Sequence, residues 1–165
     1  MPLKLAEPAA RGQIQELVRL AETAIPPSEE PELPPGRFTQ GAPEWYPFEY
    51  TIWEYGDCIR RVLDQCTRLR GDPALYEQFL RIVHNRRGKR GRQPFVLLFG
   101  YKRCAPFASQ LACEIDDWQV SGHVIDSLLK MRVSGFADIV RPFQSNEFAW
   151  IRAKAKTYCR RYGIG

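Results

Sequence analysis

The side chains with the clearest chemical potential form a basic run in the middle of the chain. It begins at Arg81 and His84 and continues through a Gly-containing loop to Arg103. Guanidinium and ammonium groups at this density are typical of contacts with phosphates or acidic proteins. A solvated loop kept soluble by its charge is the alternative. We predict partner or phosphate contacts from this run at Arg86, Arg87, Arg90, Arg92 and Lys102.

Two tryptophans form the second group with binding potential. Trp118 and Trp150 stand at the start of two predicted helices, and Arg152 follows closely after the second. Tryptophan and arginine are enriched at the interface positions that dominate binding energy. Packing between neighbouring helices is the alternative role for both rings. We therefore predict a binding face that combines the basic run with Trp118, Trp150 and Arg152.

The other titratable residues do not form a recognisable catalytic pattern. His123 and Asp126 share a helix face, which suits a general-acid pair or a hydrogen bond between helices. Asp116 and Asp117, near Glu114, suit a metal site or the cap of a helix. HExxH, GxSxG, Walker and GxGxxG motifs do not occur. We expect no catalytic residue, no metal and no cofactor, and we favour a non-catalytic protein.

Length and composition are those of one globular domain. The chain has 165 residues, of which 44% are hydrophobic and 26% charged. No apolar run approaches the roughly 18 residues of a membrane span, so we expect no membrane partner. The N-terminus lacks a hydrophobic signal core, and the five cysteines include no C-x-x-C pair. We expect a cytoplasmic protein whose cysteines are reduced core residues.

Charge is distributed unevenly along the chain. Residues 1–57 contain four basic and ten acidic residues, a net charge of −6. Residues 58–165 contain twenty basic and nine acidic residues, a net charge of +11. Either the acidic part folds back on the basic part, or the basic part attracts an acidic partner.

The hydrophobic pattern is helical, because apolar residues recur at intervals of three and four rather than two. Seven prolines between positions 26 and 47 predict an extended loop or strap, and an aromatic cluster follows at 45–55. Asp72 and Pro73 have the residue types that cap and open a helix. The resulting division is an N-terminal helix with an acidic, proline-rich strap over 1–48 and a helical domain over 49–165. Helices are predicted near 11–25, 49–70, 73–85, 92–103, 106–115, 120–131, 136–143 and 150–162.

An internal period of about 30 residues organises the second half of the chain. Paired helices at this period are typical of an α-solenoid, in which each pair buries its apolar face against the next. We therefore predict an all-α protein, a short α-solenoid of antiparallel helix pairs. Two series of apolar residues recur at intervals of 28 to 31: Phe79, Phe107 and Phe136 in the first helices, and Val96, Val124 and Ala155 in the second.

The segments 116–131 and 146–156 resemble HEAT-type repeats. In that family an acidic residue caps the second helix, and a Val-Arg or Ile-Arg pair is followed by a small residue. Ile151-Arg152-Ala153 matches this pattern, whereas Val120-Ser121-Gly122 has serine in place of the arginine. The resemblance covers about residues 73–163. It implies a scaffold that binds partners on a concave face lined by the second helices.

These observations favour a HEAT-like scaffold that recognises an acidic or amphipathic protein partner through a basic, aromatic-studded face. The acidic strap would mimic that partner and occupy the groove in the free protein. The alternative is nucleic-acid binding, because HEAT-like solenoids include alkylpurine DNA glycosylases, which cradle the duplex on a basic concave face. A third hypothesis is a lyase- or chaperone-like protein that uses the aromatic cluster at 45–55 as an apolar site. That cluster would otherwise cap the first repeat.

Overall fold

The computed structural model is all-helical, as the sequence predicts, and describes residues 4–37 and 41–163. Within these ranges the chain forms eight α-helices joined by four 3-10 segments. The α-helices are α1 (Glu7–Ala24), α2 (Pro47–Gln65), α3 (Pro73–His84), α4 (Gln93–Leu97), α5 (Ala108–Ala112), α6 (Ser121–Met131), α7 (Ala137–Val140) and α8 (Ala149–Tyr162). The 3-10 segments are η1 (Thr67–Leu69), η2 (Arg86–Arg92), η3 (Lys102–Phe107) and η4 (Arg141–Ser145).

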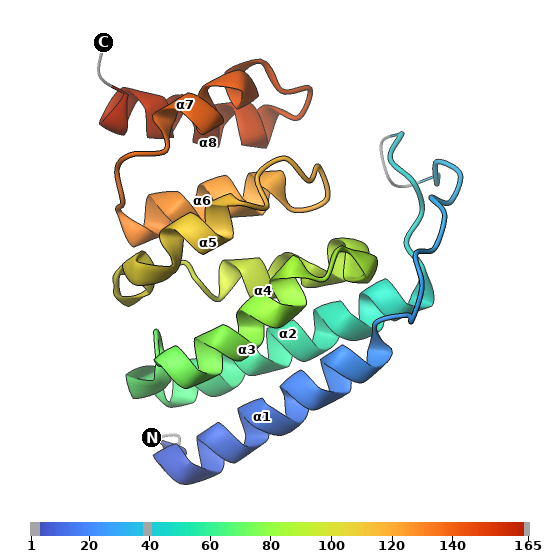
Figure 1. Cartoon of the computed structure of the whole chain (residues 1–165), viewed down its shortest axis with the longest axis vertical. Coiled ribbons are helices and arrows are strands. Elements are labelled where there is room, and N and C mark those ends of the chain that lie inside the picture. Colours follow the sequence, from blue (N-terminus) through green and yellow to red (C-terminus); the bar gives the residue numbers. More distant parts are fainter. Residues whose placement is uncertain (1–3, 38–40, 164–165) are drawn as a thin grey trace.

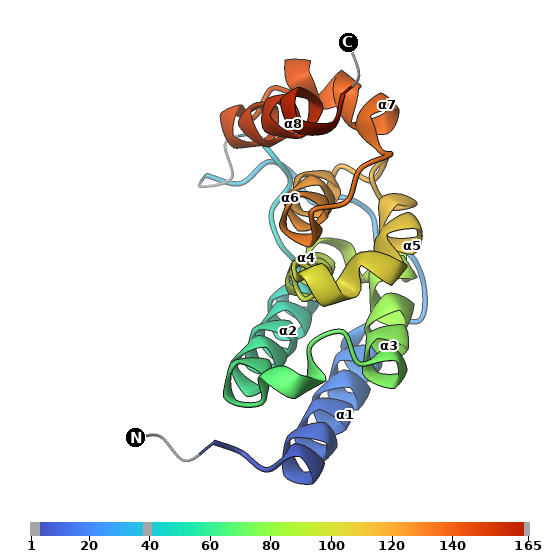
Figure 2. The same cartoon turned by 90° about the vertical axis from the view of Figure 1, so that its left-hand side faces the viewer.

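Successive helix pairs lie one above another, from α1 and α2 at one end of the molecule to α7 and α8 at the other (Figure 1). The even-numbered helices form one column and the odd-numbered helices a second column beside it (Figure 2). Helix α2 contacts α4, α4 contacts α6, and α6 contacts α8. The even-numbered helices all run in the same direction (Figure 1). Their N-terminal ends face the segment 25–46, which we call the strap, and their C-terminal ends define the opposite edge, which we call the distal edge.

The N-terminal helix belongs to the same hydrophobic core as the rest of the chain. Along α1, Ile14 and Val18 are buried at helical spacing and pack toward α2. The Arg11 guanidinium donates two hydrogen bonds, of 3.0 and 2.9 Å, to the carboxylate of Asp72. Asp72 also caps α3 by accepting from the Leu75 amide, and Pro73 is the first helical residue, which confirms the predicted start of this helix. The part of the chain before the strap is therefore structural.

The helices in the middle of the chain are shorter than the hydrophobic pattern predicts. The prediction of one helix over 92–103 was wrong, because α4 ends at Leu97 and the backbone continues in tighter turns. The Phe99 amide bonds to Val96 and the Gly100 amide to Leu97, three residues back in each case. Pro106, expected to open a helix, lies inside η3. Glycine and proline lower helix stability, and here they divide the expected helices into short α and 3-10 pieces.

The strap is held against the helices by hydrogen bonds to its backbone. The Arg87 guanidinium donates to the Pro27 carbonyl at 2.5 Å, and the Tyr46 hydroxyl donates to the Pro31 carbonyl at 2.6 Å. Further along, the Glu44 amide donates to the Pro34 carbonyl at 3.0 Å, which closes the strap on itself. The prolines between these points favour an extended chain, so a few hydrogen bonds are enough to order it. Residues 38–40 of the predicted loop lie outside the described residues.

Close packing between α2 and α4 depends on a glycine. A Cβ at Gly56 would lie 2.7 Å from the Pro94 side chain and 3.0 Å from the Phe95 ring. Both neighbours are buried, so neither can move away cheaply.

We predict that Gly56→Ala destabilises the fold by about 1–3 kcal/mol, because the added methyl group overpacks this contact. Gly12→Ala is the matched control: Gly12 also lies inside a helix, but no atom lies within 4 Å of its added Cβ. Alanine should stabilise that position by up to about 1 kcal/mol through helix propensity. Urea unfolding monitored by circular dichroism measures both values. Equal effects of the two substitutions would contradict the close contact.

Candidate functional site

The centre of the basic run is buried. Arg92 is fully buried, and its Nε and Nη1 donate to the carbonyls of Lys89 and Val83 at 2.9 and 2.8 Å. The same guanidinium forms ion pairs with Glu114, at 3.4 Å, and with Asp117. Burial of this group leaves no surface from which Arg92 can contact a partner. Its role in the structure is to join the loop before α4 to the loop before α6.

The acidic residues before α6 serve as the partners of this run. Glu114 is buried, and its carboxylate contacts Arg86 Nε at 3.1 Å and His84 Nδ1 at 2.9 Å. A second carboxylate, that of Asp116, accepts from Arg86 Nη2 at 2.8 Å, and this guanidinium lowers its pKa. Asp117 accepts from the Gln119 amide and binds Arg92. The sequence suggested a metal site or a helix cap for this acidic cluster. Neither interpretation included its main contacts, which are with Arg86 and Arg92.

Arg90 connects the strap to the helices. Its guanidinium donates to the carbonyls of Pro43 and Glu44 at 2.6 and 2.9 Å. It lies 4.9 Å from the Trp45 ring centre and 5.5 Å from that of Trp118. Buried Glu49 on α2 lies 3.5 Å from its Nε. Both tryptophan rings therefore contact the same cation, and Glu49 neutralises its charge.

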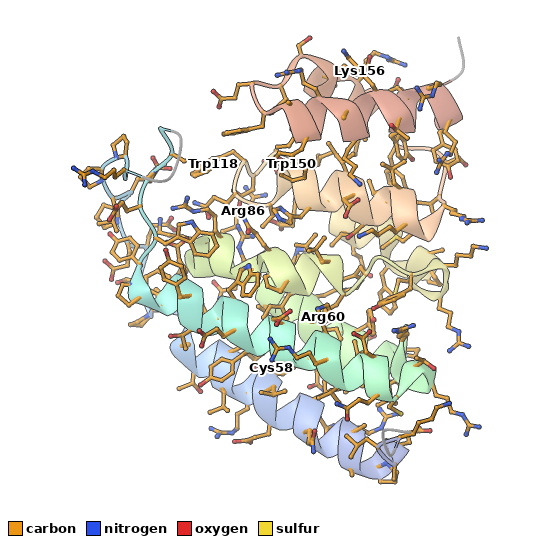
Figure 3. The ribbon with its side chains drawn as sticks, turned by 180° about the vertical axis from the view of Figure 1, so that it is seen from behind. Cys58, Arg60, Arg86, Trp118, Trp150 and Lys156 are labelled. Carbon is orange, nitrogen blue, oxygen red and sulfur yellow. The ribbon has the colours of Figure 1, made fainter. Side chains whose placement is uncertain are left out.

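The predicted binding residues are divided between the two edges of the molecule. Figure 3 shows Arg86, Trp118 and Trp150 beside the strap. Arg87 also lies there, bound to the strap carbonyl of Pro27. Lys102 instead opens η3 after the C-terminal end of α4, at the distal edge. Arg152 donates to the carbonyls of residues 146 and 147 at 2.7 and 2.9 Å, and so holds the turn before α8.

An aromatic groove lies where the strap meets the N-terminal ends of α6 and α8. Its volume is about 370 Å³, and a neighbouring hollow of about 340 Å³ shares one wall with it. Trp118 and Trp150 are each 45% exposed. The strap forms one wall and leaves the groove open. The residues that line it are Ala42, Trp45, Arg90, Gln93, Trp118, Gln119, Gly122, His123, Phe148, Trp150 and Ile151.

The groove floor is packed tightly and is neutral. A Cβ at Gly122 would lie 2.3 Å from the Trp150 ring, so only glycine admits the tryptophan here. The His123 and Trp150 rings pack edge to face, with 5.3 Å between their centres. Burial lowers the pKa of His123 to about 4. Gln119 lies in the groove wall, and its side-chain oxygen is buried without a hydrogen-bond partner among the described residues.

Two acidic side chains lie beside the groove, and three more follow the strap. Glu32 and Glu147 line the neighbouring hollow, and Glu29, Glu30 and Glu44 lie along the strap. None of these five forms an ion pair within residues 4–37 and 41–163. Arg86, Arg90 and Arg92 are paired with carboxylates, whereas these glutamates are not. Unpaired carboxylates therefore lie next to the aromatic groove, on the face that the sequence predicts to be basic.

Among the described residues, no cluster of three histidines, cysteines or carboxylates is arranged to hold a metal ion. In the same part of the chain, no helix has the length and hydropathy needed to span a membrane. Comparisons with protein families, curated proteins and solved structures find no match to this chain. The groove is therefore the feature of the molecule from which a function can be inferred.

We predict that Arg92→Met destabilises the protein by about 3–5 kcal/mol, because Asp117 loses its ion-pair partner, buried Glu114 loses one of its three, and the carbonyls of Lys89 and Val83 lose their donor. The matched control is Arg81→Met, which removes an exposed ion pair with Glu22 and should change stability by less than about 1 kcal/mol. Urea unfolding gives both free energies. Similar small losses in the two variants would contradict a structural role for Arg92.

We predict that His123 makes folding sensitive to acid. The unfolded chain binds a proton on this ring near pH 6.5, whereas the folded chain binds it only near pH 4. Its contribution to the free energy of unfolding is therefore fully present above pH 6.5 and declines as the pH falls toward 4. Unfolding of the wild type and of His123→Gln between pH 7.5 and 4.5 isolates this part. If the difference in stability between the wild type and His123→Gln stays constant over this pH range, the lowered pKa of His123 is contradicted.

Proposed function

We propose that this protein is a non-catalytic binding module whose aromatic groove holds an amphipathic protein segment. The observation that carries the proposal is the exposure of Trp118 and Trp150 in one preformed groove. Exposed aromatic rings on a rigid base lose little conformational entropy on binding and supply large contact areas. The groove and its neighbouring hollow are each of a size that takes the anchoring side chains of a peptide.

We further propose that the stacked helix pairs form a short HEAT-like α-solenoid. Equivalent repeat positions have equivalent surroundings in three successive pairs. Val83, Leu111 and Val140 are fully buried in or beside the first helices, and so are Val96, Val124 and Ala155 in the second helices. Neighbouring pairs are in contact, and these residues belong to one continuous core, as in a solenoid.

The charge around the groove supports a partner segment with basic residues next to its apolar anchor. Glu32 and Glu147 beside the groove attract cations, and the exposed Trp150 ring offers a face to which a cation can bind. Of the two partner types that the sequence suggests, acidic or amphipathic, these contacts support an amphipathic segment that is basic.

The five cysteines support a reducing setting, such as the cytoplasm. Each is a free thiol in the structure, and Cys104 is fully buried. Burial raises the pKa of the Cys104 thiol to about 11, so this sulfur is protonated and unreactive at neutral pH.

Selection of random 12-residue peptides on the intact chain tests the groove. We expect enriched peptides with an aromatic or large aliphatic residue flanked by lysine or arginine. Trp118→Ala and Trp150→Ala should each weaken such a peptide about 30-fold or more, as loss of an interface anchor worth about 2 kcal/mol does. Trp53→Ala is the control, because Trp53 is 39% exposed on α2 and does not line the groove. Fluorescence anisotropy of a labelled peptide measures the affinities.

Charge reversal tests the type of partner separately. Glu147→Lys at the groove should weaken the same peptide, whereas Glu77→Lys on α3 makes an equal change in net charge away from the groove and should have little effect. Enrichment of acidic peptides, or equal effects of the two reversals, would overturn the proposed partner chemistry.

A further inference from the structure

The largest group of unpaired cations lies at the distal edge, away from the groove. Six exposed lysines and arginines there form no ion pair with the described residues. We call them the distal row. They are Arg68, Lys102, Arg103, Arg132, Arg160 and Arg161.

Every even-numbered helix contributes to this row at its C-terminal end. Arg68 lies in η1, directly after α2, and Lys102 begins η3 after α4. Arg132 caps the end of α6, and Arg160 lies in the last turn of α8. Because these helices are parallel and stacked, their ends follow one another along the molecule (Figures 1 and 2). The stacking of the helices therefore forms the row, which contains residues up to 93 positions apart in the sequence.

A shallow basic depression lies between the first two layers of the row. Its volume is about 310 Å³, and Arg70, Lys102 and Arg103 line it. The Arg70 guanidinium is stacked 4.5 Å from the Tyr101 ring centre, and its Nε is buried without a hydrogen-bond partner. A Cβ at Gly71 would lie 2.8 Å from that of Arg103, so this glycine lets the two layers approach. Lys102 and Arg103 are the unpaired cations at this hollow, because Arg70 is paired with Asp64, and together they suit an anion with several oxygens, such as a phosphate.

The carboxylates near this edge are already occupied. Asp64 accepts from Arg60 and Arg70 at 3.0 and 2.8 Å. Asp126 binds Lys130 and Lys154 at 2.9 and 2.7 Å. These carboxylates neutralise other cations and leave the distal row uncompensated. The edge therefore carries a positive field that extends over several layers.

We propose that the distal row binds the sugar-phosphate backbone of double-stranded nucleic acid without reading its sequence. Helix layers stack about 8–10 Å apart, so the row, which follows four layers, extends over about 24–30 Å. One turn of a duplex extends over about 34 Å. A regular line of arginine and lysine over that length matches a regular line of phosphates. Release of condensed counterions then supplies the affinity.

A duplex fits this edge better than an acidic protein or a single strand does. Protein interfaces need desolvated apolar anchors, and single-strand sites need exposed aromatic rings on which bases stack. Among the described residues, the exposed aromatic side chains lie elsewhere: Tyr50 and Trp53 on the first half of α2, and Trp118 and Trp150 at the strap. At the distal edge, charge is the main source of binding energy.

The test measures the binding of a labelled 20-base-pair DNA duplex to the full chain between 50 and 200 mM salt. With six phosphate contacts, log K against log salt should fall with a slope of about −5. The double variant Lys102→Gln/Arg103→Gln should reduce the magnitude of this slope by about 2, for two scrambled duplex sequences alike. The charge-matched control Arg37→Gln/Arg81→Gln changes exposed cations outside the row and should keep the wild-type slope.

Three other probes separate the possible sources of the anion. A glutamate-rich peptide of equal charge, or a single strand, that binds as tightly as the duplex would overturn the proposal. So would displacement of the duplex by a few millimolar inorganic phosphate, which would indicate an isolated phosphate site. Trp118→Ala should leave duplex binding unchanged. Loss of peptide binding and loss of duplex binding are therefore distinguishable outcomes.

Discussion

The pairing of buried arginines with buried carboxylates is the constraint on which the rest of this structure depends. The loop 86–92 places Arg90 and Arg92 inside the molecule, where an unpaired cation would be costly. Each therefore requires a partner from another element: Glu49 on α2 for Arg90, and Glu114 and Asp117 before α6 for Arg92. Arg90 also donates to the strap carbonyls of Pro43 and Glu44. One loop thus fixes the strap, α2 and α6 relative to one another, and this places the tryptophans of the groove.

Helix direction explains why the free charges separate. The N-terminal ends of the parallel even-numbered helices carry partial positive charge, and their C-terminal ends carry partial negative charge. Carboxylates are stabilised at the strap edge, and cations are stabilised at the distal edge. The buried pairs remove the cations that would otherwise offset the glutamates beside the groove. Unpaired glutamates near the groove and a basic row on the opposite edge therefore agree with the same helix arrangement.

The hydrophobic spacing was sufficient to predict an all-helical chain, and Asp72-Pro73 located the start of α3. The candidate groove was predictable only in part. Trp118 and Trp150 were found because large rings at helix starts are visible in the sequence. The burial and pairing of the basic run were not predictable from the sequence. Its neutralisation depends on Glu49 and Glu114, which are more than 20 residues away on either side. The distal row was missed for the same reason: its members are scattered singly or in pairs, and only the stacking of helix ends brings them together.

A dense cluster of charge in a sequence is therefore weak evidence for a binding surface in a stacked helical protein. Where cations crowd into one short loop, mutual repulsion and desolvation favour structures that recruit carboxylates to them, and the loop becomes internal. Where cations occur once per layer, each is far enough from the next to remain solvated. Stacking then adds their fields without adding a cost of burial. In such a protein, the charges that recur at the helix ends determine the electrostatic potential at the surface. The densest run of charged residues in the sequence is then the part least accessible to a partner.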